Sequence, residues 1–413
     1  MSGPVLLLGA GSAAAGAEFQ LARIAAACPV VLVDATAPGW ARPYLAKHLV
    51  ADLTDHVATL KAVKEHAARY EVRGVLAYSP EHLVTAAHTA ARLGLPAPSV
   101  ASLVALRDTV QLRRLLARHR VPQPRWAEAM DAEAAVAHAD VIGYPVLVRP
   151  RSGGRTGPVA ARDAGEVRAA VERLGRDVPA AANPHGSVVV EEYLEGLHLS
   201  AETVVLPDGE AHVVAVARTS FGPMPGRQPL RHSVHAHDGL LHNPVLRNTV
   251  GRAVDAVGVQ PGVLHISVTS TPRGPRVTGV QAQPADDLIP LLVRRATGID
   301  LPRIAAHLAI GRTPDLAPVR QRAAAVHFAY APVSGRVERL TVSPRASRQP
   351  SLEELKLLQE EGNRVESVAR ATADDRLAHW VVLGSDASDC HSTLDEVSRL
   401  FSPEIVAPSA VVT

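Results

Sequence analysis

The densest group of side chains able to do acid–base or metal chemistry lies in residues 231–242, "RHSVHAHDGLLH". An imidazole titrates near neutral pH and binds transition metals, so clustered histidines can form a proton-transfer or metal site. His235 and His237 share one face if the segment is an extended strand. A solvent-exposed loop fits the same residues, because the chain has 19 histidines in total. The candidate catalytic residues of this segment are Arg231, His232 and His235.

A second candidate is the segment "GVQAQPADDLIPLLVRRATGIDL", residues 279–301, in which a strand leads into a helix. Mg²⁺ requires hard oxygen ligands at short distance. Asp286 and Asp287 are the acids of residues 260–290, and Gln281 adds a neutral, weaker oxygen ligand. These three side chains are oxygen donors close together in the sequence, two of them charged and one neutral.

The order of the apolar runs predicts an α/β fold that positions these residues. The runs "PVLLLGAG", "PVVLVDA" and "GVLAYS" alternate with helical stretches, which indicates an open parallel sheet. A basic helix, the strand "YPVLVRP", the glycine-rich loop "RSGGRTGP" and antiparallel hairpins follow, and "VHFAYAPVSGRV" belongs to a last small module. We predict three domains: 1–105, 106–312 with a lid lobe at about 125–195, and 313–413.

Composition narrows the classes of function. A chain of 413 residues is too long for one compact core, and 47% hydrophobic with 20% charged residues is ordinary for a soluble protein. The net charge is +2, and no block of Lys and Arg with interleaved aromatics suggests nucleic-acid binding. No apolar run reaches 18 residues, and the N-terminus lacks the basic region of a signal peptide. We therefore expect no membrane span and a cytoplasmic location.

Several segments together resemble the ATP-grasp superfamily, in the branch of carboxylate–amine ligases that join amino acids. The resemblance runs in unbroken order from about residue 70 to 400, through "LGLPAPS", "GYPVLVRP", the glycine loop, "VVVEEYLEG", "GPRV", "ATGIDL", "FAYAPVSGRV" and "DDRLAHWVVLGSD". It implies an N-terminal open parallel α/β domain, a two-lobed α+β ATP-grasp core and a small C-terminal α+β module. It also implies that ATP lies between two β-rich lobes, that carboxylates hold Mg²⁺, and that an amine attacks an acyl phosphate.

The resemblance further implies a nucleotide site on the matching residues. Two lysines of the family correspond to Thr109 and Arg149 here, and Arg keeps the charge of Lys without being equivalent to it. A glutamate that contacts the ribose corresponds to His198. The implied cofactor-binding residues are Arg149, Gly153, Gly154, Arg155, Thr156, Glu191, Glu192, Tyr193 and His198.

The metal positions depart from the family pattern. The two magnesium glutamates correspond to Ser267, two residues after His265, and to Gly279. The family asparagine corresponds to Gln281, and the arginine that orients the acyl phosphate corresponds to Gln283. The resemblance places His265 beside the cleft, so it joins the candidate catalytic residues. Set against that pattern, Asp286, Asp287 and Gln281 are the candidate metal ligands, although two acids and one amide form a weak set for Mg²⁺. Four losses in one constellation favour a protein that no longer performs Mg-ATP ligation.

These observations support one main interpretation and leave two alternatives. The main one is a degenerate ATP-grasp protein, a pseudoenzyme that binds or transforms a small anionic or amino-acid-like metabolite in biosynthesis. The alternatives are an active ATP-dependent carboxylate–amine ligase that forms an amide or peptide bond in specialised metabolism, and a non-catalytic partner of a biosynthetic enzyme. ATP is a possible ligand, Mg²⁺ is a doubtful cofactor, and the resemblance implies a possible homodimer.

Overall fold

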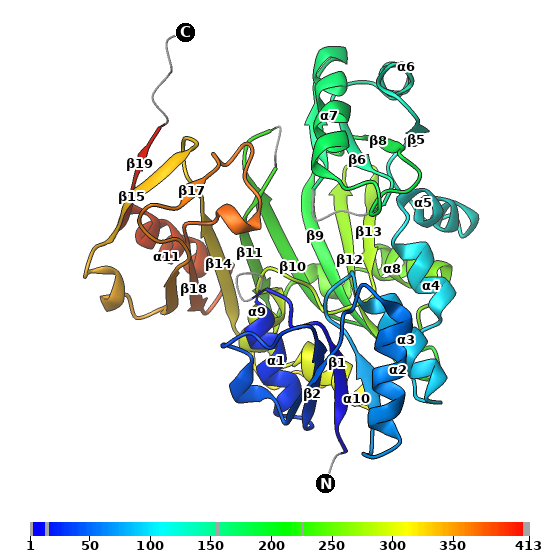
Figure 1. Cartoon of the computed structure of the whole chain (residues 1–413). Coiled ribbons are helices and arrows are strands. Elements are labelled where there is room, and N and C mark those ends of the chain that lie inside the picture. The colour runs from blue at the N-terminus through cyan, green and yellow to red at the C-terminus, as the bar shows by residue number, and fades with distance from the viewer. Residues whose placement is uncertain (1–2, 13–15, 153–156, 225–226, 408–413) are drawn as a thin grey trace.

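Four β-sheets organise the part of the chain that the structure describes, and most of its helices pack on their faces (Figure 1). The computed structural model describes residues 3–12, 16–152, 157–224 and 227–407. The predicted fold class is confirmed: a parallel N-terminal sheet precedes antiparallel sheets that build a two-lobed core.

The N-terminal sheet has the strand order β3-β2-β1-β4, and its strand pairs are parallel. Leu6 and Leu8 of β1 pack with residues of α2 and α3, whereas Val5 and Leu7 pack with residues of α1 and α10. Burial on both faces explains why this strand is a continuous apolar run. The elements are β1 Val5–Leu8, α1 Ala17–Ala25, β2 Val30–Asp34, a 3₁₀ turn Arg42–Tyr44, β3 Lys47–Val50, α2 His56–Ala67, β4 Gly74–Leu76, α3 Leu83–Arg92 and α4 Val100–Leu106.

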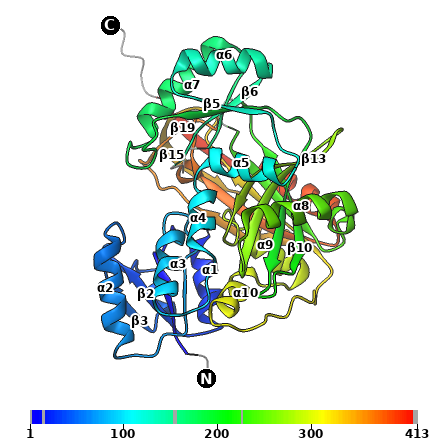
Figure 2. The same ribbon diagram turned by 90° about the vertical axis from the view of Figure 1, so that its right-hand side faces the viewer.

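A smaller antiparallel sheet, of order β5-β8-β6-β7, lies in the range predicted as the lid lobe, and we call it and its helices the lid. Helices α6 and α7 cover it, and Figure 2 shows them outermost, above the rest of the chain. Asp131 and Asp163 begin these helices by accepting backbone N–H bonds from Ala134 and Glu166. The elements are α5 Thr109–Arg118, β5 Trp126–Ala129, α6 Ala132–Ile142, β6 Val146–Pro150, β7 Val159–Ala161, α7 Ala164–Asp177 and β8 Val188–Glu192.

The largest sheet has eight strands in the order β13-β12-β9-β10-β11-β14-β18-β16. Helix α8 packs on one face with apolar residues of β9, β12 and β13, and α9 and α10 pack on the opposite face. The elements are β9 Leu197–Val205, β10 Ala211–Phe221, β11 Pro229–His235, a 3₁₀ turn Gly239–His242, α8 Pro244–Val257, β12 Gly262–Thr271, β13 Gly274–Gln281, α9 Ile289–Thr297 and α10 Leu301–Ala309.

The last hundred residues continue the large sheet and add a three-stranded one of order β17-β15-β19. Because β14, β16 and β18 hydrogen-bond into the large sheet, the boundary at 312/313 is not a break between sheets and stays a prediction. The elements are β14 Ala323–Ala329, β15 Gly335–Val342, β16 Leu352–Leu357, β17 Arg364–Val365, β18 Ala378–Gly384, α11 Ala387–Arg399 and β19 Phe401–Val406, with 3₁₀ turns Ala346–Arg348 and Ala373–Asp375.

Candidate functional site

Polar side chains gather on one face of the large sheet where β9, β12 and β13 lie side by side. Leu199, Ala201 and Ile266 pack toward α8 on the other face. Side chains alternate along a strand, so the residues between them project from the opposite face. The register aligns two rows across the strands: Ser200, Ser267 and Gly279 in one, and Glu202, His265 and Gln281 in the other. We call these six residues the polar face.

Glu202, His265 and Ser267 form a hydrogen-bonded chain across this face. Glu202 is fully buried, and its Oε1 lies 2.9 Å from His265 Nδ1. The same Oε1 accepts a 2.7 Å hydrogen bond from Ser200 Oγ. On the other side of the imidazole ring, Nε2 lies 3.3 Å from Ser267 Oγ. The imidazole therefore lies between a carboxylate and a hydroxyl and contacts both.

The charge around His265 favours its protonated form. Burial lowers the pKa of His265, but the Glu202 carboxylate, with smaller contributions from Asp286 and Asp287, raises it above its ordinary value overall. Sequence reasoning did not identify Glu202. A signal existed in "LSAETVV", where Ser200 and Glu202 alternate with apolar residues in a strand that is otherwise buried.

Asp287 is a second charged group near this face, and its partners are protein cations. Its Oδ1 accepts a 2.7 Å hydrogen bond from Arg376, and its Oδ2 lies 3.8 Å from His232 Nε2. Arg376 is buried, donates to the Tyr330 hydroxyl at 2.9 Å, and lies 3.8 Å over the Phe328 ring. Burial raises the pKa of Asp287, but Arg376 and then His232 lower it to well below its usual range. Asp287 therefore acts as an ionised structural partner of Arg376.

The residues at the expected metal positions do not fit Mg²⁺. Ser267 and Gly279 face each other where the resemblance implies two carboxylates, and Gln281 is exposed at the end of β13. Asp287 already binds Arg376. Within the ranges that the structure describes, no three His, Cys, Asp or Glu residues are arranged to hold a metal ion. Mg²⁺ requires several hard oxygen ligands, and the polar face does not gather them.

On the nucleotide side, Glu191 lies buried between two arginines. Arg113 Nε donates to Glu191 Oε1 at 2.7 Å, and Arg149 Nε lies 3.1 Å from Oε2 as an ion pair without hydrogen-bond geometry. Arg113 is fully buried and also donates to the carbonyls of Val277 and Thr278 on β13. Burial raises the pKa of Glu191, and the two guanidinium groups lower it below its ordinary value overall. This cluster joins α5 and the lid to the large sheet.

The other residues expected to contact the nucleotide do not all lie in one cluster with Glu191. Glu192 accepts the Arg125 backbone N–H at 3.1 Å and a hydrogen bond from Arg273 at 2.7 Å, so it joins the lid to the β12–β13 turn. The four loop residues named from the sequence lie outside the described residues: Gly153, Gly154, Arg155 and Thr156. Thr109 begins α5, with its backbone N–H bonded to the Arg151 carbonyl at 2.8 Å.

Arg227 forms a cationic centre where the lid strand β8 leads into β9. Its guanidinium lies 4.9 Å from the Tyr193 ring centroid and 4.6 Å from that of Phe221. It also donates to His198 Nε2 at 2.8 Å, and His198 Nδ1 contacts Thr269 Oγ1 at 3.1 Å. Burial, and then Arg227, lower the pKa of His198 to about 4, so this imidazole is neutral at pH 7. Among the described residues no carboxylate pairs with Arg227. Sequence reasoning named His198 and Tyr193 but missed Arg227.

The histidine-rich segment does not form one cluster. His232 points to Thr219, at 3.0 Å, and to Asp287, whereas Arg231 projects to His327 and Asp395 on the C-terminal module. His235 and His237 contact each other edge to face, with ring centroids 5.9 Å apart. Strand alternation in β11 separates Arg231 from His232, so the structure brings only His232 toward the loop that carries Asp287. The catalytic roles of these residues stay predictions.

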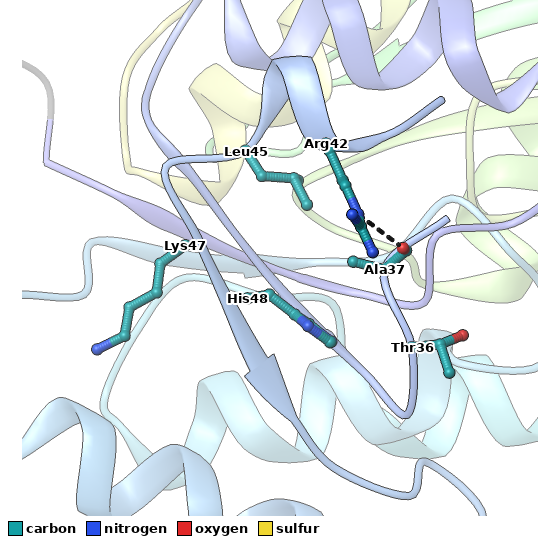
Figure 3. Close-up of a pocket in the computed structure, with 6 residues that line it drawn as sticks. All are labelled: Thr36, Ala37, Arg42, Leu45, Lys47 and His48. Atoms are coloured by element: carbon teal, nitrogen blue, oxygen red, sulfur yellow. Dashed lines mark hydrogen bonds between the residues drawn. The ribbon is translucent and has the colours of Figure 1, made fainter. Parts of the chain in front are cut away.

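Two hollows lie away from the polar face. Gln283 is buried, and neither amide atom has a hydrogen-bond partner among the residues that the structure describes. It borders a cavity of about 80 Å³ between the N-terminal domain and the large sheet. A wider surface hollow of about 500 Å³ lies on the N-terminal domain. Figure 3 shows Arg42 and His48 turned toward it and Lys47 directed away, with its ammonium over the Tyr70 ring. Neither hollow gathers groups for acid–base catalysis.

Comparison with known sequences finds a family match that runs from α5 to just beyond β10. Residues 108–227 match the family described as "Carbamoyl-phosphate synthase L chain, ATP binding domain". The chain is 26% identical to the uncharacterized protein y4rH of Sinorhizobium fredii over 348 residues, which cover 83% of this chain and 70% of that one. It is 30% identical to the carbamoyl phosphate synthase large chain of Archaeoglobus fulgidus over 207 residues, 47% of this chain but only 18% of that protein.

Solved structures extend the likeness to nearly the whole chain. The L-amino acid ligase of Bacillus licheniformis superposes with a TM-score of 0.80 at 16% identity, covering 98% of this chain and 99% of that one. The N5-carboxyaminoimidazole ribonucleotide synthetase of Thermotoga maritima gives a TM-score of 0.70 at 15% identity, with 98% and 100% covered.

The chain therefore has the fold of the ATP-grasp carboxylate–amine ligases. Over residues 108–227 its sequence also matches an ATP-grasp ATP-binding domain. In the part of the chain that the structure covers, no helix has the length and apolar character to cross a membrane.

Proposed function

We propose that this chain binds a small anionic, amino-acid-like metabolite at the polar face, beneath the lid, and does not perform Mg-ATP ligation. The carrying observation is Arg227, a cation held by two aromatic rings and a neutral imidazole without a carboxylate partner among the described residues. Such a guanidinium is available to a ligand carboxylate or phosphate, which it can bind through two parallel hydrogen bonds.

The neighbouring charges support an anion. Arg113 and Arg149 share the single carboxylate of Glu191. Burial, and then the charge of Arg149, lower the pKa of Arg227. A third guanidinium group therefore lies close enough to this arginine pair to be affected by its charge. ATP without Mg²⁺ is one anion that the positive charge of these arginines would attract. The amino-acid-like part of the proposal rests on the likeness to an L-amino acid ligase.

An active carboxylate–amine ligase is the second candidate, and the fit to that ligase along the whole chain favours it. It requires metal ligands other than those at the expected positions. The polar face supplies Ser267, Gly279 and Gln281 there, and Asp287 is engaged by Arg376. The loss of metal-stabilised charge in phosphoryl transfer removes several kcal/mol of transition-state stabilisation, and each 1.36 kcal/mol is tenfold in rate. A homodimer is likewise proposed from the resemblance.

Thermal unfolding in EDTA tests the proposal. We expect at least one of L-glutamate, O-phospho-L-serine, inorganic phosphate and ATP to raise the Tm, since a ligand at 100 times its Kd stabilises by about 2.7 kcal/mol. Arg227→Gln should abolish this rise. Arg168→Gln, which removes an exposed cation paired with Glu133 on the lid, should preserve it. A rise in Tm that requires ATP and Mg²⁺ together would favour the ligase instead.

A further inference from the structure

We propose that Ser267 is a nucleophile, with His265 as its general base and Glu202 as the residue that positions His265. The site would accept an acyl group from an activated ester or thioester of a small carboxylic acid. This inference deepens the proposed function, on which it rests, by naming a metal-free reaction for the polar face.

The geometry is that of an activated nucleophile. A nucleophilic hydroxyl must contact a base, and the base must be oriented by a third group. Glu202 Oε1 contacts His265 Nδ1 at 2.9 Å, and His265 Nε2 contacts Ser267 Oγ at 3.3 Å. Catalytic hydrogen bonds of this kind are often long before substrate binds. Because the carboxylate holds Nδ1, the Nε2 atom is the one directed at the hydroxyl.

The sheet holds these groups in fixed positions. Glu202 pairs directly with His265 in the register of β9 and β12, and Ser200 pairs with Ser267 one row away. Ser200 Oγ also donates to Glu202 Oε1 at 2.7 Å, which fixes the carboxylate. Side chains on neighbouring strands of a central sheet are better placed for catalysis than side chains on loops.

Ser267 is open on the side of β13. Gly279 pairs with it across the strands, and a Cβ built at Gly279 would lie 3.8 Å from Ser267 Oγ, in ordinary contact. The absence of a side chain at position 279 therefore leaves room beside the hydroxyl, which is half-buried. The two substitutions that remove the expected magnesium carboxylates are thus also the ones that create and uncover this hydroxyl.

The reaction balances without a metal or an oxidant. Ser267 Oγ attacks the carbonyl carbon of the ester or thioester while His265 Nε2 takes the hydroxyl proton. The tetrahedral intermediate collapses, the bond to the leaving oxygen or sulfur breaks, and His265 gives its proton to that alcohol or thiol. Water or an amine then attacks the acyl-serine through the same base and releases an acid or an amide. General base catalysis of this kind contributes about 10²–10⁴-fold.

The arrangement of Glu202 favours function over stability. Its Oε2 is buried without a hydrogen-bond partner in the described structure. A buried carboxylate with an unpaired oxygen is costly, and a buried Glu–His pair is a poor stabiliser compared with apolar residues. Because packing alone gives no reason for the Glu202–His265 pair beside the Ser267 hydroxyl, we infer that the pair serves a reaction.

Labelling with a fluorophosphonate, whose fluoride a serine oxygen displaces, tests the inference on the full chain. We expect one adduct per chain by intact mass, on the peptide that contains Ser267. Ser267→Ala should abolish it, and His265→Gln should slow it by about 100-fold. Ser270→Ala is the matched control, since it removes a hydroxyl from the opposite face of the same strand and should change nothing.

The variant Glu202→Gln tests whether Glu202 positions His265 for the reaction or only stabilises the fold. The Glu202 carboxylate raises the pKa of His265, together with Asp286 and Asp287 on the loop before α9. Removing its charge should shift the midpoint of the labelling rate to lower pH, a shift that a purely structural residue would not cause. Failure to label folded wild-type protein, or labelling that persists in Ser267→Ala, would overturn the inference. Either result leaves the proposed anion site standing, because ligand binding there is measured independently.

Discussion

Replacing Glu191 by Gln is expected to lower the free energy of unfolding by about 3–5 kcal/mol. The carboxylate is ionised and buried between Arg113 and Arg149. Without its charge, two guanidinium groups are left without an anion between them, and one of them, Arg113, has no access to water. Removing one partner of a buried ion pair is costly because the remaining charge stays desolvated. Urea unfolding followed by tryptophan fluorescence measures the loss, since Trp126 pairs with Glu191 across β5 and β8.

The control is Glu172→Gln on α7 of the same lid. Glu172 is exposed and lies 3.6 Å from Arg176, one turn along the helix. Such surface pairs contribute about 0.3–0.5 kcal/mol. Equal losses in the two variants would mean that the Arg113–Glu191–Arg149 cluster does not hold the lid to the large sheet.

Replacing Asp287 by Asn is expected to lower the free energy of unfolding by about 3 kcal/mol, the lower end of the range for a broken buried pair, because Asp287 keeps some contact with water. The change leaves Arg376, which is 1% exposed, without an anion. Asn tolerates the left-handed backbone found at this residue, φ +58°, so the backbone itself should not be strained. Thermal or urea unfolding would measure the difference.

Asp395→Asn provides the comparison, because Asp395 pairs with Arg231 at the surface and is 50% exposed. Its removal should change stability by less than about 1 kcal/mol. If Asp287→Asn were neutral, Asp287 would not be committed to Arg376 and would be available as a metal ligand. The two outcomes therefore also distinguish a structural Asp287 from a catalytic one.

Much of the fold could be predicted from the sequence, because buried strands such as those in "PVLLLGAG" and "YPVLVRP" are recognisable as short apolar runs. The sequence also predicts a departure from a magnesium site, since the resemblance aligns Ser267 and Gly279 with carboxylates of the family. The sequence does not predict the extent of the large sheet, because β14 and β18 join it through pairings between segments that are far apart in the chain.

The chemistry of the polar face depends on contacts that no local pattern contains. His265 meets Glu202 only through the register of β9 and β12, 63 residues apart. Arg227 gains its role from Tyr193, directly after β8, and from His198 on β9, which is 29 residues away in the sequence. Conversely, the histidines of 231–242 are close in sequence, yet His232 and His235 lie on opposite faces of β11, and His237 and His242 lie beyond its end.

The central claim is that this protein, which has an ATP-grasp fold, does not use magnesium to bind ATP. Its most direct test is calorimetric titration of ATP into the full chain, once with millimolar Mg²⁺ and once with EDTA. We predict the same affinity in both, or no binding in either, because the polar face lacks carboxylates where Ser267 and Gly279 stand. Tight binding that requires Mg²⁺ would contradict the account and identify the chain as a candidate active ligase.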